Sequence, residues 1–184
     1  TIGDTATSSA STTVQTEQPR LTGEYKDPLA QSFVVDDVTG VYLTGLNLFF
    51  QEVPADSSAS PVTVQIREVE LGTPNQRILP FSEVSLNPDE IEVSLDSSVA
   101  TRFNFESPVY LNGQREYAII ILSESTEYRV WTSRLGEVDI STIDNIETDQ
   151  ILVTTQRLLG SLFKSQNAST WTPSQYEDLK FKFY

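Results

Sequence analysis

Hydrophobic and polar residues alternate in four stretches of this 184-residue chain. A period of two sends successive side chains to opposite faces of a strand, so one face lies in a core and the other in water. The four stretches are 62–66, 91–95, 101–105 and 179–183. We expect each of them to form a half-buried β-strand.

Two further stretches are apolar on both faces. They read VYLTGLNLFF (41–50) and YAIIIL (117–122). Strands that are buried on both faces show such runs in place of alternation. We therefore expect these two stretches to be central strands of a sheet that is covered on both sides.

Turn-forming residues separate the predicted strands at intervals that suit a sandwich. They occur at 37–40, 54–58, 72–75 and 87–89 and at Asn112-Gly113. Asn112-Gly113 favours a tight hairpin because both residues tolerate positive φ. No stretch sustains a helical period of 3.6 residues. The predicted fold class is all-β: an antiparallel, jelly-roll-like β-sandwich with an extended N-terminal arm.

The chain divides into an arm and one module. Residues 1–24 are rich in Thr and Ser and hold few large apolar side chains, so they cannot offset their own ordering entropy. We expect this arm or linker to be held by a neighbour, to which Thr12, Thr13 and Val14 could add as a strand. Residues 25–184 form the sandwich. The absence of Met and the strand-like ending at Tyr184 lead us to expect part of a longer polypeptide.

The charge and the hydropathy disfavour two classes of partner. The net charge is −14, and a field of that sign repels phosphate backbones, so we expect no nucleic acid. No apolar run approaches the roughly 20 residues that span a bilayer, so we expect no membrane insertion.

The residue types also argue against catalysis. Cys and His are absent, which removes thiol nucleophiles, imidazole bases and the usual zinc ligands. Adjacent acids such as Asp36-Asp37 and Glu177-Asp178 point to opposite faces of a strand and do not form a glycosidase pair. We therefore expect no enzyme, no catalytic residue, no cofactor and no metal. A structural Ca²⁺ on an acidic loop, such as 137–149, stays open as an alternative.

The two tryptophans raise the question of sugar binding. Trp131, Tyr128 and Arg129 lie close together in sequence and could form a platform for a glycan. The competing interpretation is that Trp131 packs against the C-terminal segment. Trp171 lies in a polar stretch, where a lone Trp usually anchors a loop to the core.

Several blocks together resemble a recurring module in baseplate and tail-fibre proteins of tailed bacteriophages, notably T4-like myoviruses that infect cyanobacteria. The blocks are DPLAQSF (27–33), GVYLTGLNLFF (40–50), VQIREVELGTPNQ (64–76), ATRFNFESPVYLNGQREYAIIIL (100–122), YRVWTSRLGE (128–137) and GSLFKSQNASTWTPSQYEDLKFKFY (160–184). The resemblance covers about residues 25–184 and is most specific in the last block. It is weakest over 141–159.

The resemblance implies a non-enzymatic structural module of a virion, assembled in the host cytoplasm. Its partners would be other virion proteins or copies of itself. Besides Thr12, Thr13 and Val14, the expected contacts are Lys180, Lys182 and Tyr184 in the last strand. The alternative function is a carbohydrate-binding module for a host-surface glycan. A bacterial surface or secreted β-sandwich is a third reading.

Overall fold

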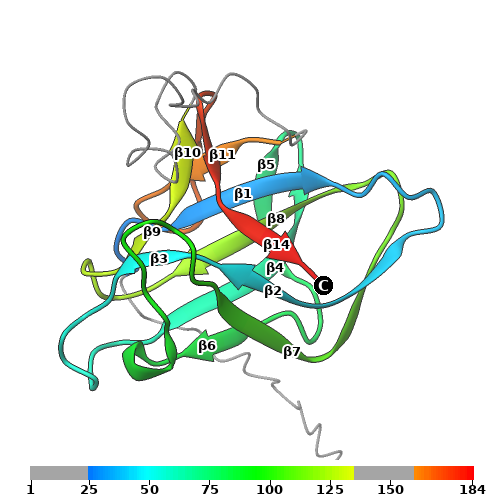
Figure 1. Cartoon of the computed structure of the whole chain (residues 1–184). Helices are drawn as coiled ribbons and strands as arrows, with labels where there is room; N and C mark the ends of the chain where they lie inside the picture. Colours follow the sequence, from blue (N-terminus) through cyan, green and yellow to red (C-terminus); the bar gives the residue numbers. More distant parts are fainter. Residues whose placement is uncertain (1–24, 135–159) are drawn as a thin grey trace, which may run out of the picture.

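This computed structural model describes residues 25–134 and 160–184, and strands make up 53% of the structure against 2% for helix (Figure 1). Every named pair of neighbouring strands is antiparallel, and the predicted all-β, sandwich-like fold is confirmed. The predicted contacts Thr12, Thr13 and Val14 and the acidic stretch 137–149 lie outside the described residues.

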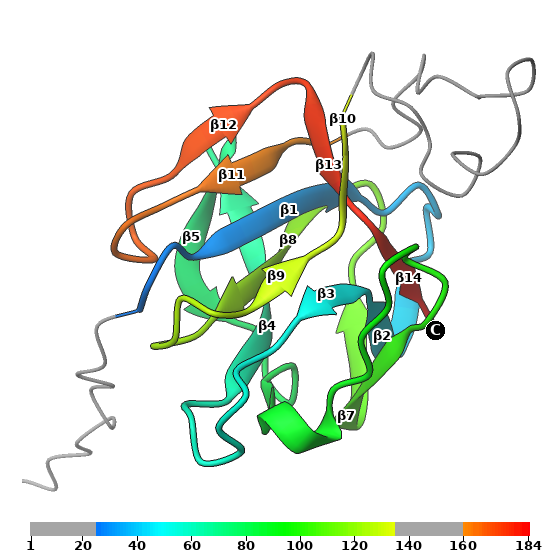
Figure 2. The same cartoon turned by 60° about the vertical axis from the view of Figure 1, so that its left-hand side comes forward.

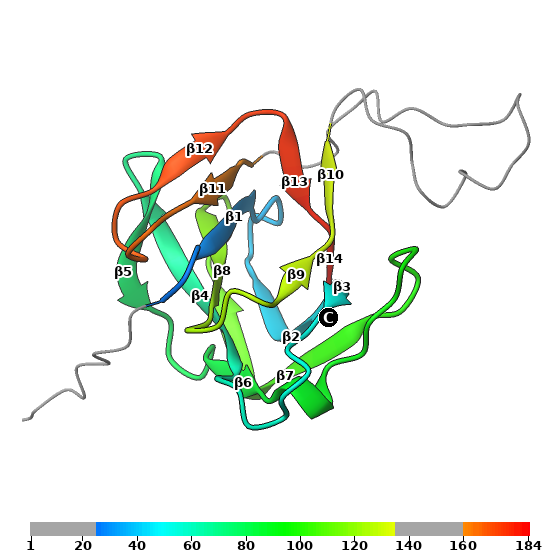
Figure 3. The same cartoon turned by 90° about the vertical axis from the view of Figure 1, so that its left-hand side faces the viewer.

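The larger layer is a seven-stranded sheet that curls like half a barrel (Figure 3). Its strands are β1 (Leu29–Val34), β4 (Val62–Glu70), β5 (Thr73–Ile78), β6 (Val84–Leu86), β8 (Glu116–Leu122), β11 (Leu162–Lys164) and β12 (Thr172–Ser174). The order across the sheet is β12-β11-β1-β8-β4-β5, and β6 also pairs with β4.

The opposing layer consists of three smaller sheets. The largest has the order β14-β2-β7, and each of the other two is a strand pair (Figure 2). The strands are β2 (Val41–Leu48), β3 (Phe50–Glu52), β7 (Thr101–Leu111), β9 (Arg129–Val130), β10 (Thr132–Arg134), β13 (Glu177–Leu179) and β14 (Phe181–Phe183). β3 pairs with β9, and β10 pairs with β13. A single 3-10 turn, Pro88–Glu90, precedes β7.

The main core fills the space between the two layers. Its fully buried side chains include Val64, Ile66 and Ile119 from the large sheet and Leu46 and Phe103 from the small one. The alternation predicted over 62–66 and 101–105 is therefore confirmed, because the apolar side chains of both stretches point into this core.

A second core lies on the outer face of the large sheet. Ala118, Ile120 and Leu122 of β8 pack there against Phe163 and Trp171. Their neighbours in sequence point into the main core, so β8 is buried on both faces, as predicted for 117–122. Trp171 is only 8% exposed, which confirms that it anchors its polar loop.

The buried Arg67 side chain also holds this loop. Its Nη1 donates to the carbonyl of Ala168 at 3.1 Å, while Nε and Nη2 donate to Gln65 Oε1. Desolvation lowers the pKa of Arg67. The loop that contains Trp171 is thus attached to the sheet by apolar packing and by hydrogen bonds to its backbone.

Two predicted strands differ from expectation. β2 is central in its sheet, but it is covered on one face only, since Tyr42 is 70% exposed. The stretch 91–95 forms only an isolated bridge between Val93 and Phe50, and Leu95 is 84% exposed. The reason is local: Asp96 Oδ1 accepts hydrogen bonds from the backbone N–H and the hydroxyl of Ser98, and such side-chain bonds compete with sheet formation.

The final strand and one turn also differ in detail. Leu179 and Phe181 follow the predicted alternation, but the chain changes partner at Lys180, so that β13 pairs with β10 and β14 with β2. The hairpin after β7 falls at Asn112-Gly113, yet the positive φ belongs to Gln114, at 55°.

Candidate functional site

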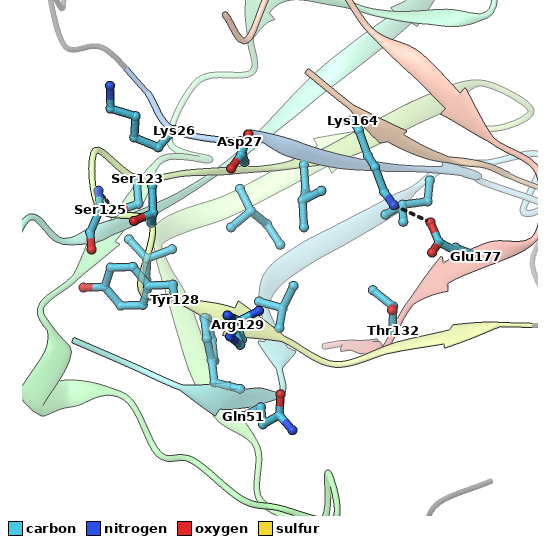
Figure 4. Close-up of a pocket in the computed structure, with 17 residues that line it drawn as sticks. Lys26, Asp27, Gln51, Ser123, Ser125, Tyr128, Arg129, Thr132, Lys164 and Glu177 are labelled. Carbon is cyan, nitrogen blue, oxygen red and sulfur yellow. Dashed lines mark hydrogen bonds and ion pairs between the residues drawn. The ribbon is translucent and has the colours of Figure 1, made fainter. Parts of the chain in front are cut away.

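A cleft of about 430 Å³ opens between the layers at the end of the sandwich where β1 begins (Figure 4). Its floor is apolar, because the inward faces of strands from both layers end there. The floor residues are Leu29, Phe50, Val62, Ile121, Val130 and Leu162. The rim is polar.

One wall of the cleft is fixed by an ion pair between the two layers. Lys164 Nζ of β11 lies 2.7 Å from Glu177 Oε2 of β13, and Figure 4 shows the pair at one side of the cleft. The Ser174 hydroxyl donates to the same carboxylate oxygen at 2.8 Å. The Lys164 ammonium, together with the Ser174 hydroxyl, lowers the pKa of Glu177 below its usual 4.5.

Two of the three predicted glycan-platform residues line this cleft. Tyr128 packs its ring edge-on to Phe50 and donates its hydroxyl to the Ser60 carbonyl at 2.8 Å. Burial raises the pKa of Tyr128 to about 12. Arg129 forms an ion pair with Glu52 at 2.7 Å.

Trp131 does not line the cleft. Its indole Nε1 donates to the Ser94 carbonyl at 2.9 Å, and its own carbonyl accepts from the Lys180 N–H at 3.0 Å. Trp131 therefore contacts the 94–99 loop and the C-terminal segment, and the three platform residues are not gathered in one site.

A second hollow, of about 380 Å³, lies at the opposite end of β1 and β2. Its lining is largely apolar. It borders a cluster of exposed apolar and aromatic side chains that we call the terminal surface: Val34, Val41, Tyr42, Tyr110 and Tyr184. The rings of Tyr42 and Tyr110 lie against each other with centroids 5.1 Å apart and a tilt of 49° between their planes.

Basic groups accompany the terminal surface on the outer face of the small sheet. Arg102 lies over the Tyr184 ring at 3.6 Å, and Lys182 Nζ lies 4.9 Å from the same ring. Of the predicted contacts in the last strand, Lys182 and Tyr184 thus belong to this exposed face. Lys180 does not, because its ammonium donates to the carbonyl and hydroxyl of Ser97.

β14 is an edge strand among the described residues. The Tyr184 N–H donates to the Gly45 carbonyl, and the Tyr184 carbonyl accepts from the Thr44 N–H. Because successive residues of a strand direct their backbone groups to opposite sides, those of Phe181 and Phe183 face away from β2. That side of β14 has no partner strand in the part of the chain that the structure describes.

The described ranges were also searched for metal sites and for membrane-spanning helices. Over 25–134 and 160–184, no group of three or more His, Cys, Asp or Glu side chains could hold a metal ion. Nor does that part of the chain contain a helix long and apolar enough to cross a membrane. The open Ca²⁺ alternative on 137–149 falls outside these residues.

Comparison of the chain with protein-family models, with curated proteins and with solved structures finds no match in any of the three.

The sequence did not point to several residues that form these two hollows. Asp27 and Gln51 line the cleft, and Val34 and Val41 border the terminal surface. The stretch 41–50, which was expected to be buried on both faces, includes the exposed Tyr42. In β7, the period of two of residues 101–105 continues as far as Tyr110, and this is the signal that could have placed the Tyr110 side chain on the outer face.

Proposed function

We propose that this chain is a non-enzymatic structural module of a tailed-phage virion, in the baseplate or a tail fibre, and that it assembles through the terminal surface. The observation that carries the proposal is the edge of β14 that has no partner strand among residues 25–134 and 160–184, beside an apolar hollow. The resemblance of residues 25–184 to baseplate and tail-fibre modules supports placing it in a phage tail.

An open edge beside exposed apolar side chains favours association. Unpaired N–H and C=O groups on an edge strand form a template for another strand, and proteins usually block such edges. Tyr42 is 70% exposed, and Val34 and Val41 are each 37% exposed. Apolar clusters of this kind mark interaction surfaces.

The occupant that we propose is the N-terminal arm of a second copy. Residues 12–16 read TTVQT, and β-branched residues suit an added strand. The arm has three acids, Asp4, Glu17 and Glu24, and one base, Arg20, so its charge complements Lys182 and Arg102.

The length of the arm allows it to reach a neighbouring copy. Lys26, just after the arm, is bonded to Ser123 at the cleft end, whereas the hollow beside β14 lies at the far end of β1. Residues 1–24 can span up to about 80 Å when extended, which is enough to reach another copy.

The full chain and two variants test the proposal by light scattering coupled to gel filtration. We expect the full chain to associate, with a mass that rises with concentration. Tyr42→Glu should abolish association, because it places a charge on the terminal surface. Val14→Pro should also abolish it, because proline lacks the N–H that an added strand donates.

Two control variants test whether the loss of association is specific to the terminal surface and to Val14. Tyr176 is also exposed but lies in the turn between β12 and β13, and Tyr176→Glu should leave the mass unchanged. Ala6→Pro should likewise have no effect. A full chain that stays monomeric at every concentration would overturn assembly between copies, and association that survives Tyr42→Glu would exclude the terminal surface.

A further inference from the structure

The cleft where β1 begins continues into a further hollow of about 510 Å³, which is distinct from the hollow beside the terminal surface. Asp27 and Lys164 line both hollows, so the two meet at these residues. This 510 Å³ hollow is otherwise lined by hydroxyl and amide side chains: Ser165, Gln166, Asn167, Thr170 and Thr172. We call the combined depression the polar trough.

Much of the hydrogen-bonding capacity of the polar trough is unused within the described chain. The carboxylate of Asp27, the amides of Gln51 and Gln166 and the hydroxyls of Thr132 and Thr172 make no hydrogen bond or ion pair to any described residue. These groups lie along the trough from the cleft to the β11–β12 loop. They therefore provide donors and acceptors at spaced positions for an extended polar ligand.

Asp27, at the junction of the two hollows, is held in an unusual backbone conformation. Its φ is 44°, in the left-handed region, although it precedes Pro28, which favours extended backbone in the preceding residue. Hydrogen bonds on either side fix the chain there: Lys26 N to Ser123 O at 2.8 Å, and Ser165 N to Pro28 O at 3.0 Å. Such strained residues concentrate at functional sites.

The balance of charges in the trough favours an uncharged ligand. Two of its cations, Lys164 and Arg129, are each engaged in an ion pair, with Glu177 and Glu52 respectively. The Asp27 carboxylate adds a negative charge near Lys26. An anionic ligand would therefore find no excess of positive charge to attract it.

We propose that the polar trough binds a neutral oligosaccharide. Carboxylate and amide groups can each bond sugar hydroxyls, which both donate and accept. The partly exposed side chains of Leu29, Val130 and Tyr128 offer a surface for the less polar face of a sugar ring. The trough joins hollows of about 430 and 510 Å³, and two adjoining hollows offer room for more than one sugar.

This inference goes beyond the assembly function and does not depend on it. The polar trough and the terminal surface lie at opposite ends of β1, so a module could hold a glycan while it is bound to a neighbouring copy. The trough also replaces the platform expected from sequence, because it includes Tyr128 and Arg129 but not Trp131.

An array of neutral and anionic glycans, followed by calorimetry with the best neutral hit, tests the proposal on the full chain. We expect saturable binding to a neutral oligosaccharide. Asp27→Asn, which suits the same left-handed backbone, should weaken binding at least about tenfold through loss of a charged acceptor. Gln51→Ala and Gln166→Ala should each weaken it several-fold.

Three controls make the result specific. Asp89→Asn removes an exposed acid outside the trough and should leave affinity unchanged. Trp131→Phe should do the same, whereas a loss of binding there would overturn the trough in favour of the Trp131 platform. Tyr42→Glu should abolish association but not glycan binding, which separates this proposal from the assembly function.

The proposal fails if no neutral glycan on the array binds saturably. It also fails if only anionic glycans bind, or if Asp27→Asn binds as tightly as the unaltered chain while circular dichroism shows that both are folded.

Discussion

Single polar residues join the two layers of the sandwich. Gln31 of β1 is fully buried, donates through Nε2 to Asp178 Oδ1 at 3.2 Å and accepts from the Leu179 N–H at 2.8 Å. At the cleft rim, the Lys164–Glu177 pair connects the same strand, β13, to β11. Both contacts attach the C-terminal segment to β1 and β11, which explains how a short strand such as β13 keeps its place.

The ion pair gives stability a defined dependence on pH. The pKa of Glu177 is lowered in the folded state, so its contribution is complete above the unfolded value of 4.5 and is lost as the pH falls through the folded pKa. We expect Glu177→Gln to lower the melting temperature at neutral pH and to have a shrinking effect as the pH falls below about 4.5.

Melting curves of both proteins between pH 7 and pH 3 measure this difference. Glu127→Gln, which removes an exposed acid with no ion pair among the described residues, is the control and should show no such convergence. A difference between Glu177→Gln and the unaltered chain that stays constant with pH would contradict the assignment.

At the scale of elements, β2 shows how backbone contacts shape a strand. Its register against β7 shifts between Leu43 and Gly45, and a Cβ at Gly45 would lie 2.3 Å from the Phe103 carbonyl oxygen. Only glycine allows the two backbones to approach so closely. The bulge also lies where Thr44 and Gly45 bond Tyr184, so it supports the pairing of the chain beyond β14.

Gly45→Ala should therefore destabilise the fold by at least about 2 kcal/mol, since the contact is with buried backbone that cannot move away. Gly72→Ala is the matched control: its φ is +78° but its Cβ would meet open space, and we expect a cost of about 1–2 kcal/mol. Urea unfolding measures both. Equal costs would show that the strand relaxes around the added methyl group.

The C-terminal strand illustrates a limit of periodicity. The alternation over 179–183 correctly places Leu179, Phe181 and Phe183 toward the core and Lys182 outward. The alternation does not show which strands pair with this segment. Before Lys180 the segment pairs with β10, and after it with β2. A period of two reports which face is buried, whereas pairing depends on segments far away in sequence.

For the whole molecule, the net charge of −14 is spread over a fold with only a few ion pairs in its described part: Arg77 with Glu68, Arg129 with Glu52 and Lys164 with Glu177. Repulsion among so many acids opposes the compact state. Arg102 and Lys182 place two positive charges beside Tyr184 of the terminal surface, whereas Asp36 and Asp37 line the adjoining hollow.

Salt should therefore stabilise the fold. Raising NaCl from about 0.02 M to 0.5 M shortens the screening length several-fold. We expect an increase in melting temperature of roughly 2–4 °C, which corresponds to about 1 kcal/mol for a chain of this size. Differential scanning fluorimetry measures the shift.

A variant with a smaller net charge is the control for screening. Glu92→Gln with Glu106→Gln removes two exposed acids and should show a smaller increase with salt. A melting temperature that falls with salt would mean that the ion pairs outweigh the repulsion.

The sequence by itself determined the fold class. The period of two and the apolar run of β8 follow from which side chains are buried, and this depends on the polarity of the residue at each position. It also determined that Trp171 anchors a loop, since a large apolar side chain in a polar stretch has to be buried somewhere.

Only the tertiary structure decided which residues line the two hollows of the trough. Asp27, Gln51 and Gln166 are far apart in sequence and line one trough, because the start of β1, strand β3 and the end of β11 lie at the same end of the sandwich. Trp131 is directed away from that trough by a hydrogen bond to Ser94, which lies 37 residues earlier. Contacts between residues so far apart in sequence depend on which strands pair with each other. Local patterns of residues do not determine that pairing.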